Sequence, residues 1–240
     1  MQHPTLALIG FGAFGRLTAR LLAPHCRILV CDPSETACEA ARQEGLTPVA
    51  LPEVAAADIL LLCVPVPQLG QTLSALAPHL RPGQLIADVA SVKSAPAALM
   101  QNLLPDHVDL LATHPMFGPQ SAAGGTRGLQ LVLCPLRGTT WRRPAAFLRK
   151  TFGLRILLST PDQHDREAAY TQGLTHLLAR AMRDLGPAPK LRTKSFDLLD
   201  QAFAMVRDDA PEVFDAVTRD NPHVAPLQAQ LAALLSPASR

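Results

Sequence analysis

A glycine-rich segment stands near the start of the chain, between a short apolar run and an amphipathic stretch. Its glycines, Gly10, Gly12 and Gly15, have the spacing G-x-G-x-x-G. In a strand-turn-helix unit the first glycine permits the tight turn, the second lets the backbone approach a pyrophosphate, and the third lets the helix pack close to the strand. The helix N-terminus then faces the anion. We expect a dinucleotide to bind here, in contact with Phe14 of the same segment; the alternative is that the glycines serve only a tight turn.

A carboxylate follows the second apolar run, since Asp32 lies about 20 residues beyond the glycines. At this place it can accept hydrogen bonds from the hydroxyls of an adenosine ribose. It would repel a 2′-phosphate, as would Glu35, and no arginine follows in Asp32-Pro33-Ser34. The pattern therefore favours NAD over NADP. The alternative role for Asp32 is to cap the next helix.

Two further polar segments follow predicted strands, Asp88-Val-Ala-Ser91-Val-Lys93-Ser94 and Thr113-His114-Pro115-Met-Phe-Gly-Pro-Gln-Ser121. Sheets of this kind bind ligands beyond the carboxyl ends of their strands, so we expect both segments to be loops at that edge. An imidazole has an ordinary pKa of about 6.5 and can accept a proton at neutral pH, which makes His114 the first candidate base. The alternative is a loop histidine that hydrogen-bonds the backbone ahead of Pro115.

At these segments the chain resembles the prephenate/arogenate dehydrogenase family, whose loops carry D-x-x-S-V-K and then H-P-M-F-G-P or a near variant. The similarity runs from Leu6 to about His223 and is greatest to the compact arogenate-type enzymes of plants. Its later part rests on four segments: Gln163-His164-Asp165, Thr175-His176, Thr193-Lys194-Ser195-Phe196-Asp197-Leu198-Leu199 and Asn221-Pro222.

The resemblance implies hydride transfer from C4 of a cyclohexadienol ring to the nicotinamide, with loss of the ring carboxylate as CO2 and formation of a phenol. The substrate would be prephenate or arogenate, a precursor of tyrosine. His114 matches the family base, and Ser91 matches the serine that orients the base and the 4-hydroxyl. The family also places the substrate between its two domains and forms homodimers through the helical one, so we expect both features here.

Three further residues are candidates for substrate contact. Lys93 would lend positive charge near a dianionic substrate or belong to a solvated first turn of a helix. His176, with Gln172 one turn before it, would reach the substrate or the nicotinamide pocket, or the histidine would be a satisfied core residue. For Ser91 the alternative is a helix cap, and for His164 and Asp165 it is a structural place at the start of a helix.

The chain departs from the family pattern at the group that holds a substrate carboxylate. Enterobacterial-type members have an arginine where this chain has Asp197. The unranked candidates for that task are Arg192, Lys194, Arg207 and Arg127. The choice between prephenate and arogenate depends on whether the pocket meets a keto group or an ammonium; Asp165 would be a partner for the ammonium or a helix cap.

The alternation of apolar runs and amphipathic stretches predicts an α/β fold, a doubly wound Rossmann-type, mostly parallel sheet followed by a smaller all-helical domain. We place the dinucleotide-binding domain at 1–158 and the helical substrate and dimerisation domain at 159–240. The expected strands are 6–9, 28–31, 59–64, 85–89, 110–113 and 129–133. The expected helices are 12–22, 35–44, 69–80, 95–104, 163–185, 195–207, 210–218 and 222–235.

The composition excludes several other classes of protein. With 48% hydrophobic residues, 18% charged residues and a net charge of +2, the chain is neither disordered nor built to bind nucleic acid. Its five cysteines lack a C-x-x-C pair, so we expect reduced thiols and no metal site. The N-terminus lacks the pattern of a signal peptide and no apolar run is long enough to span a membrane, which favours the cytoplasm.

Two other functions are compatible with parts of the pattern. A hydroxyacid or imine dehydrogenase with the same two-domain plan would explain the glycines but leave Ser91 and His114 without a role. A non-catalytic NAD-binding sensor would explain the missing arginine; it would bind NAD and form no NADH from either cyclohexadienol.

Overall fold

The computed structural model of the chain describes residues 4–236. The chain divides into two compact units, Met1–Pro161 and Asp162–Arg240. Each unit has its own elements and is described by itself below. The domain division after residue 158 remains a prediction.

The first unit is built on a sheet with the strand order β3-β2-β1-β4-β5-β6-β7-β8 in its described part. The strands are β1 (Thr5–Ile9), β2 (Arg27–Cys31), β3 (Thr47–Pro48), β4 (Ile59–Leu62), β5 (Leu85–Asp88), β6 (Asp109–Pro115), β7 (Gln130–Arg137) and β8 (Arg155–Leu158). Neighbouring strands are parallel except β6 and β7. The predicted doubly wound, mostly parallel sheet is confirmed, and the short strand β3 and the edge strand β8 are additions to it.

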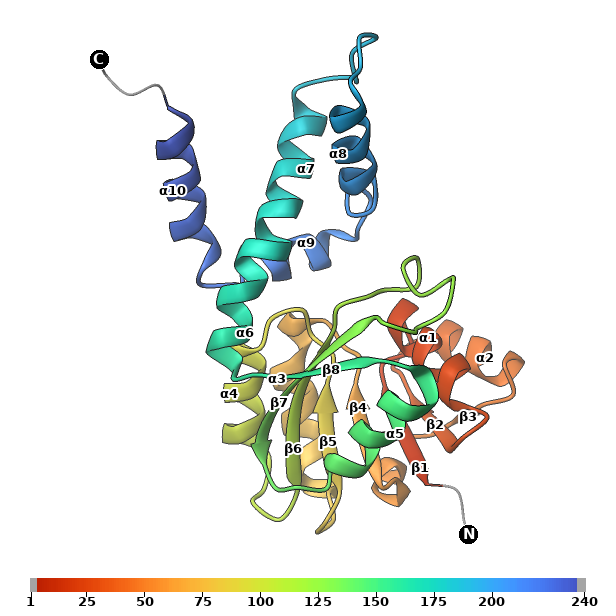
Figure 1. Cartoon of the computed structure of the whole chain (residues 1–240). Coiled ribbons are helices and arrows are strands. Elements are labelled where there is room, and N and C mark those ends of the chain that lie inside the picture. Colours follow the sequence, from red (N-terminus) through yellow and green to blue (C-terminus); the bar gives the residue numbers. More distant parts are fainter. Residues whose placement is uncertain (1–3, 237–240) are drawn as a thin grey trace. The chain divides into compact units, whose positions relative to one another are not determined.

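Helices cover both faces of this sheet (Figure 1). They are α1 (Ala13–Leu22), α2 (Glu35–Gln43), α3 (Val66–Leu76), α4 (Ser94–Leu103) and α5 (Arg142–Phe152), with 3₁₀ turns η1 (Leu51–Ala56) and η2 (Ala77–His79). Side chains of α3 and α4 share one apolar cluster with Ala7 and Ile9, and those of α1 and α2 share another with Leu6 and Leu8. This alternation along β1 is the period of two that a strand covered on both faces requires.

Strand β6 is longer than the sequence pattern predicted. It continues through His114 to Pro115 because the antiparallel strand β7 pairs with it, and His114 lies opposite Val132. The expectation that His114 belongs to a loop is therefore wrong, and the loop between these strands begins only at Met116. The histidine is fixed by sheet pairing, which leaves its backbone little freedom.

The second unit is helical in its described part. Its elements are α6 (Pro161–Ala168), the π-turn η3 (Ala169–Gly173), α7 (Leu174–Asp184), α8 (Lys194–Ala204), α9 (Pro211–Thr218) and α10 (Val224–Leu235). The predicted helix 163–185 is thus one helical run that a π-turn divides. A Cβ on Gly173 would lie 2.6 Å from Cγ2 of Val224 and 3.2 Å from the carbonyl oxygen of Val217, so close packing requires glycine here.

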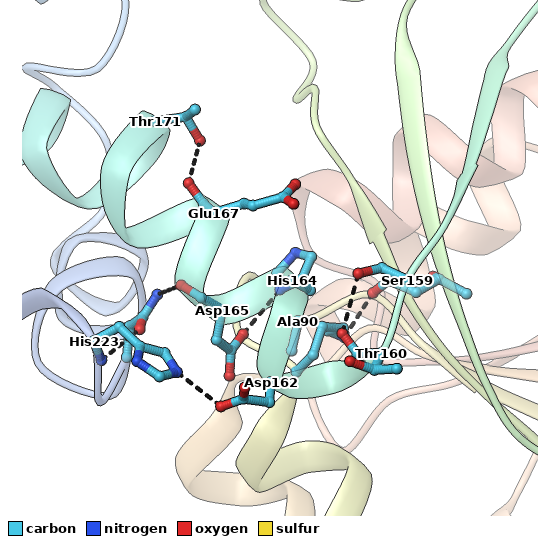
Figure 2. Close-up of polar contacts among 12 residues, drawn as sticks. Ala90, Ser159, Thr160, Asp162, His164, Asp165, Glu167, Thr171 and His223 are labelled. Atoms are coloured by element: carbon cyan, nitrogen blue, oxygen red, sulfur yellow. Dashed lines mark hydrogen bonds and ion pairs between the residues drawn. The ribbon is translucent and has the colours of Figure 1, made fainter.

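Polar contacts hold the start of α6 to the segment before α10 (Figure 2). His164 Nδ1 lies 2.9 Å from Oδ1 of Asp165, and Asn221 Nδ2 donates to the backbone oxygen of Asp165 at 2.8 Å. His223 Nε2 lies 2.9 Å from Oδ1 of Asp162. The Asp165 side chain is fully buried. These contacts support the structural alternative for His164 and Asp165.

A membrane-spanning helix and a cluster of metal-ligating side chains are both absent from residues 4–236. Within that range no helix has the length and apolar character needed to cross a membrane. The same range holds no group of three or more His, Cys, Asp or Glu side chains suited to a metal ion. Cys26, Cys31, Cys38 and Cys63 are not joined by disulfide bonds.

Candidate active site

The glycine-rich turn joins β1 to α1 as the sequence pattern predicted. Gly10 has a φ of +99°, and a Cβ there would lie 2.6 Å from the carbonyl oxygen of Cys63. A Cβ on Gly15 would lie 2.5 Å from the carbonyl oxygen of Gly10. The first glycine therefore makes the turn against β4, and the third lets α1 approach the turn.

Gly12 differs from the other two glycines because a Cβ there would have no described atom within 4 Å. It is the N-cap residue of α1, and no described side chain caps the helix there. Open space beside the uncapped N-terminus of a helix suits a pyrophosphate, since backbone N–H groups and the helix dipole both attract an anion. The residues present fit a dinucleotide.

Asp32 directly follows β2 and faces this turn. Its Oδ2 accepts a hydrogen bond from the backbone N–H of Phe11 at 2.7 Å, and its Oδ1 accepts one from Ser34 at 2.8 Å. The cap of α2 is Ser34, whose hydroxyl accepts from the backbone N–H of Ala37. The alternative of Asp32 as the cap of the next helix is therefore wrong, and the carboxylate ties the glycine-rich turn to the end of β2.

Phe14, at the start of α1, lies near an aromatic side chain from the loop after His114. The ring centroids of Phe14 and Phe117 are 6.3 Å apart, with the planes inclined by 48°. This contact brings the glycine-rich turn and the segment after β6 together within the first unit.

His114 and Ser91 lie at the carboxyl edge of the parallel strands, where the glycine-rich turn also lies. His114 occupies the end of β6 and is only 3% exposed. Ser91 is half-buried in the loop between β5 and α4. The N-cap residue of α4 is Lys93, and no described side chain caps that helix. Ser91 therefore does not cap α4, which was the alternative to its functional role.

Lys93 is fully buried, so the expectation of a solvated first turn is wrong. Its Nζ pairs with Oδ2 of Asp88 and donates to the backbone oxygen of Thr113 at 2.6 Å. An ammonium in this place offers no open surface to a substrate. Sequence reasoning assigned no role to Asp88 or Thr113. The signals for them were the aspartate of the D-x-x-S-V-K pattern and the place of both residues at the ends of neighbouring strands.

His176 and Gln172 lie together in the second unit, at and just after the π-turn. His176 is 3% exposed; its Nδ1 lies 2.9 Å from the backbone oxygen of Gln172 and its Nε2 lies 3.0 Å from Oδ2 of Asp209. Both ring nitrogens thus have partners inside the unit. Oε1 of Gln172 is buried and has no hydrogen-bond partner among the described residues, a condition that is rare in folded proteins.

Two of the candidate carboxylate-binding arginines are held by neighbouring carboxylates. Arg192 contacts Asp197 at 2.6 Å and Asp200 at 2.8 Å, and Arg207 contacts Asp200 at 3.5 Å. The hydrogen bond from Arg192 lowers the pKa of Asp200, so the Asp200 carboxylate stays ionised and offsets the charge of the guanidinium. Lys194 and Arg127 carry no ion pair among those described.

Cys63 lies beside the glycine-rich turn but offers no nucleophile. Its sulfur-bearing side chain packs near Gly15, and burial raises the pKa of its thiol to about 12. At neutral pH it is an un-ionised, apolar packing residue.

The sequence of the chain is similar to those of known dehydrogenases. Residues 18–146 match the family model described as prephenate dehydrogenase, nucleotide-binding domain. Arogenate dehydrogenase 2, chloroplastic, of Arabidopsis thaliana is 30% identical over 230 residues, which are 91% of this chain and 64% of the relative. Arogenate dehydrogenase 1, chloroplastic, of the same plant is 33% identical over 214 residues, 82% of this chain and 33% of the relative. The chain therefore spans less than two thirds of the length of either relative.

A solved structure with a similar fold is that of prephenate dehydrogenase from Aquifex aeolicus in complex with hydroxyphenyl propionate and NAD+. It has a TM-score of 0.75 and 18% sequence identity, and the match covers 98% of this chain and 89% of that chain. At this identity the likeness concerns the fold. The family model covers more than half of the chain, and together with the first relative it shows that the chain belongs to the prephenate/arogenate dehydrogenase family.

Proposed function

We propose that the protein is an oxidoreductase that oxidises and decarboxylates arogenate or prephenate with NAD, as a step in making tyrosine. The observation that carries this proposal is the meeting of three features at one edge of one sheet. These are the glycine-rich turn after β1, Ser91 after β5 and His114 at the end of β6. The names of the relatives agree with the proposed reaction.

NAD is the proposed cofactor, and the Aquifex aeolicus structure is a complex with NAD+. When bound, this cofactor accepts a hydride from C4 of the substrate ring. Gly12 and the N-terminus of α1 would hold its pyrophosphate, with Gly10, Gly15 and Phe14 shaping the turn. Asp32 would accept hydrogen bonds from the adenosine ribose and repel the additional phosphate of NADP.

His114 is the proposed base for the 4-hydroxyl of the substrate. Oxidation at C4 gives the hydroxyl carbon carbonyl character, so its proton must leave, and a placed imidazole can accept it. Ser91 would donate to or accept from the same hydroxyl and so orient it toward His114. Loss of the ring carboxylate as CO2 then leaves an aromatic phenol, which makes the overall reaction favourable.

Arogenate is the favoured substrate of the two. The two plant relatives reported for this chain are named arogenate dehydrogenases.

A homodimer formed through the helical unit is also part of the proposal. Several large apolar side chains of that unit are exposed, among them Leu185, Leu191, Leu234 and Leu235. Apolar side chains gathered on one unit are typical of a surface that a second copy covers. Light scattering coupled to size-exclusion chromatography tests this directly, and a mass of one chain across micromolar concentrations would contradict it.

The experiment that tests the proposed function is an assay of reduced nicotinamide at 340 nm with four combinations of substrate and cofactor. Arogenate and prephenate are each run with NAD and with NADP. We expect the highest kcat/KM with arogenate and NAD. A higher kcat/KM with NADP would overturn the role of Asp32, and a preference for prephenate would overturn the choice of arogenate as substrate. No turnover in any combination, with NAD binding retained, would instead identify a non-catalytic sensor.

A further inference from the structure

A buried ion pair joins the two segments that carry the proposed catalytic residues. The side chains of Lys93 and Asp88 are 0% and 1% exposed, and Nζ of the lysine contacts Oδ2 of the aspartate. Asp88 is the last residue of β5, and Lys93 is the residue before α4. Ser91 lies in the short loop that this pair closes.

The same pair reaches across to the next strand. Oδ1 of Asp88 accepts a hydrogen bond from the backbone N–H of Thr113 at 3.2 Å, and Nζ of Lys93 donates to the backbone oxygen of Thr113 at 2.6 Å. The Thr113 hydroxyl donates to the backbone oxygen of Asp88. Both backbone polar groups of the residue that precedes His114 are thereby held by the two charged side chains.

A further bond fixes the loop itself. The backbone N–H of Ala90 donates to Oδ2 of Asp88 at 2.9 Å, one residue before Ser91. The bonds to Thr113 are buried, so water does not compete for their donors and acceptors, and charged partners make them stronger than neutral ones. The loop after β5 and the end of β6 are therefore joined by bonds from both charged side chains.

We infer that Asp88 and Lys93 are positioning residues that set the place of Ser91 relative to His114. Neither charged group is exposed to a substrate; each acts through the backbone of the residue it holds. The inference rests on the proposed function, since it assigns these residues to the same reaction. It replaces the direct substrate contact expected for Lys93.

The distance between a base and the hydroxyl it serves governs turnover more than it governs cofactor binding. A misplacement of about 1 Å can reduce the rate about 100-fold. The glycine-rich turn and Asp32 are held by other bonds, which run to Cys31, Phe11 and Ser34. Loss of the pair should therefore lower kcat and leave the affinity for NAD nearly unchanged.

The test compares the single variant Lys93→Met with the double variant Asp88→Asn/Lys93→Met. The single variant removes the charge of the lysine at similar side-chain length. The double variant leaves no uncompensated buried charge, so it should fold even if the single variant does not. Gly138→Ala is the matched control. Gly138 has a φ of +76°, and a Cβ there would lie 1.9 Å from the Asp109 carboxylate, at the far end of β7 from His114. The control lowers stability at a place remote from the proposed site.

All variants are assayed with NAD and arogenate or prephenate, at least about 15 °C below the lowest melting temperature. We expect kcat to fall about tenfold or more in each ion-pair variant that folds, with the Kd for NAD within about twofold of the original protein. Gly138→Ala should keep its kcat within about twofold despite its lower melting temperature.

An unchanged kcat in the double variant would overturn the inference, as would an equal loss of kcat in the Gly138→Ala control. If the unaltered protein forms no NADH from either substrate, the proposed function fails and this inference falls with it. That outcome is distinct from an active protein whose ion pair can be removed without effect.

Discussion

His114 in the first unit and His176 in the second are equally buried, at 3% exposure each, but they are held in different ways. His114 lies at the end of a paired strand and follows a residue fixed by a buried ion pair. His176 lies on a helix and has a partner at each ring nitrogen, a backbone oxygen and the carboxylate of Asp209. Burial alone therefore does not distinguish a candidate base from a histidine that stabilises its own unit.

The two regions also differ in how their polar groups are exposed. At the sheet edge the Asp88–Lys93 pair is buried, whereas the helical unit is rich in half-exposed pairs such as Arg192 with Asp197. Exposed pairs contribute about 0–1 kcal/mol each, and breaking a buried pair costs several kcal/mol. The charged pair at the sheet edge is thus costly to break, as firm placement of a base requires, whereas exposed pairs such as Arg192–Asp197 contribute little.

Replacing each histidine in turn tests whether His114 and His176 have different roles. His114→Asn should lower kcat by about 10²–10⁴, because the group that accepts the proton is lost, and should leave the Kd for NAD within about twofold. His176→Asn should keep kcat within about tenfold and lower the free energy of unfolding by about 1–2 kcal/mol, since it loses hydrogen bonds inside its unit.

Steady-state kinetics, NAD titration and denaturant melts on both variants measure these quantities. Equal losses of kcat would place His176 in the chemistry alongside His114. A loss of NAD affinity parallel to that of kcat in His114→Asn would count against the role of His114 as a base.

Gly15 and Gly12 of the glycine-rich turn should respond differently to replacement by alanine. Gly15→Ala forces a Cβ to within 2.5 Å of the Gly10 carbonyl oxygen, so α1 or the turn must shift. We expect it to lower the free energy of unfolding by about 1–3 kcal/mol and to weaken NAD binding. Gly12→Ala meets no described atom within 4 Å, so it should leave stability unchanged and weaken NAD binding alone, about tenfold.

Thermal melts with and without NAD separate the two variants. If Gly12→Ala binds NAD as well as the unaltered protein, the open space at this glycine is not where the pyrophosphate lies.

Much of the sheet and of the cofactor turn could be predicted because local signals determine them. Apolar runs, the three glycines and Asp32 lie within short stretches whose spacing has one favoured structure. Helix α5 is not among the helices expected from the sequence, although its apolar residues Ala145, Leu148 and Phe152 recur at helical spacing.

The ion pair and the length of β6 could not be predicted in the same way. Lysine is a surface residue by default, and the burial of Lys93 depends on Asp88 and Thr113 becoming neighbours only when β5 and β6 pair. His114 joined the strand because β7 runs antiparallel to β6, and nothing near His114 in the sequence specifies that pairing. Both features are long-range in the chain, and both lie at the candidate site.

The smallest expected effect concerns the helical unit at low pH. Hydrogen bonds from Arg166 and then from His223 lower the pKa of the Asp162 carboxyl group. Figure 2 shows the contact with His223. A carboxyl group whose pKa is lowered in the folded state adds stability above its ordinary pKa of about 4, and this is lost as the pH falls through the folded value. The group is fully exposed, so solvent screens much of the effect.

Melting temperatures measured from pH 5 to pH 3 test this contact. The difference between Asp162→Asn and the unaltered protein should shrink as the pH falls, because the aspartate becomes protonated and resembles the amide. A difference that stays constant over this range would show that the carboxylate charge at Asp162 does not stabilise the helical unit.

The most direct test of the proposed chemistry is the stoichiometry of a single reaction run to completion with limiting arogenate and excess NAD. NADH is read at 340 nm, CO2 is trapped and counted, and tyrosine is quantified by chromatography. We predict equal amounts of NADH, CO2 and tyrosine, because hydride transfer, loss of the ring carboxylate and formation of the phenol belong to one turnover. NADH without CO2, or no NADH at all with either arogenate or prephenate, would contradict it.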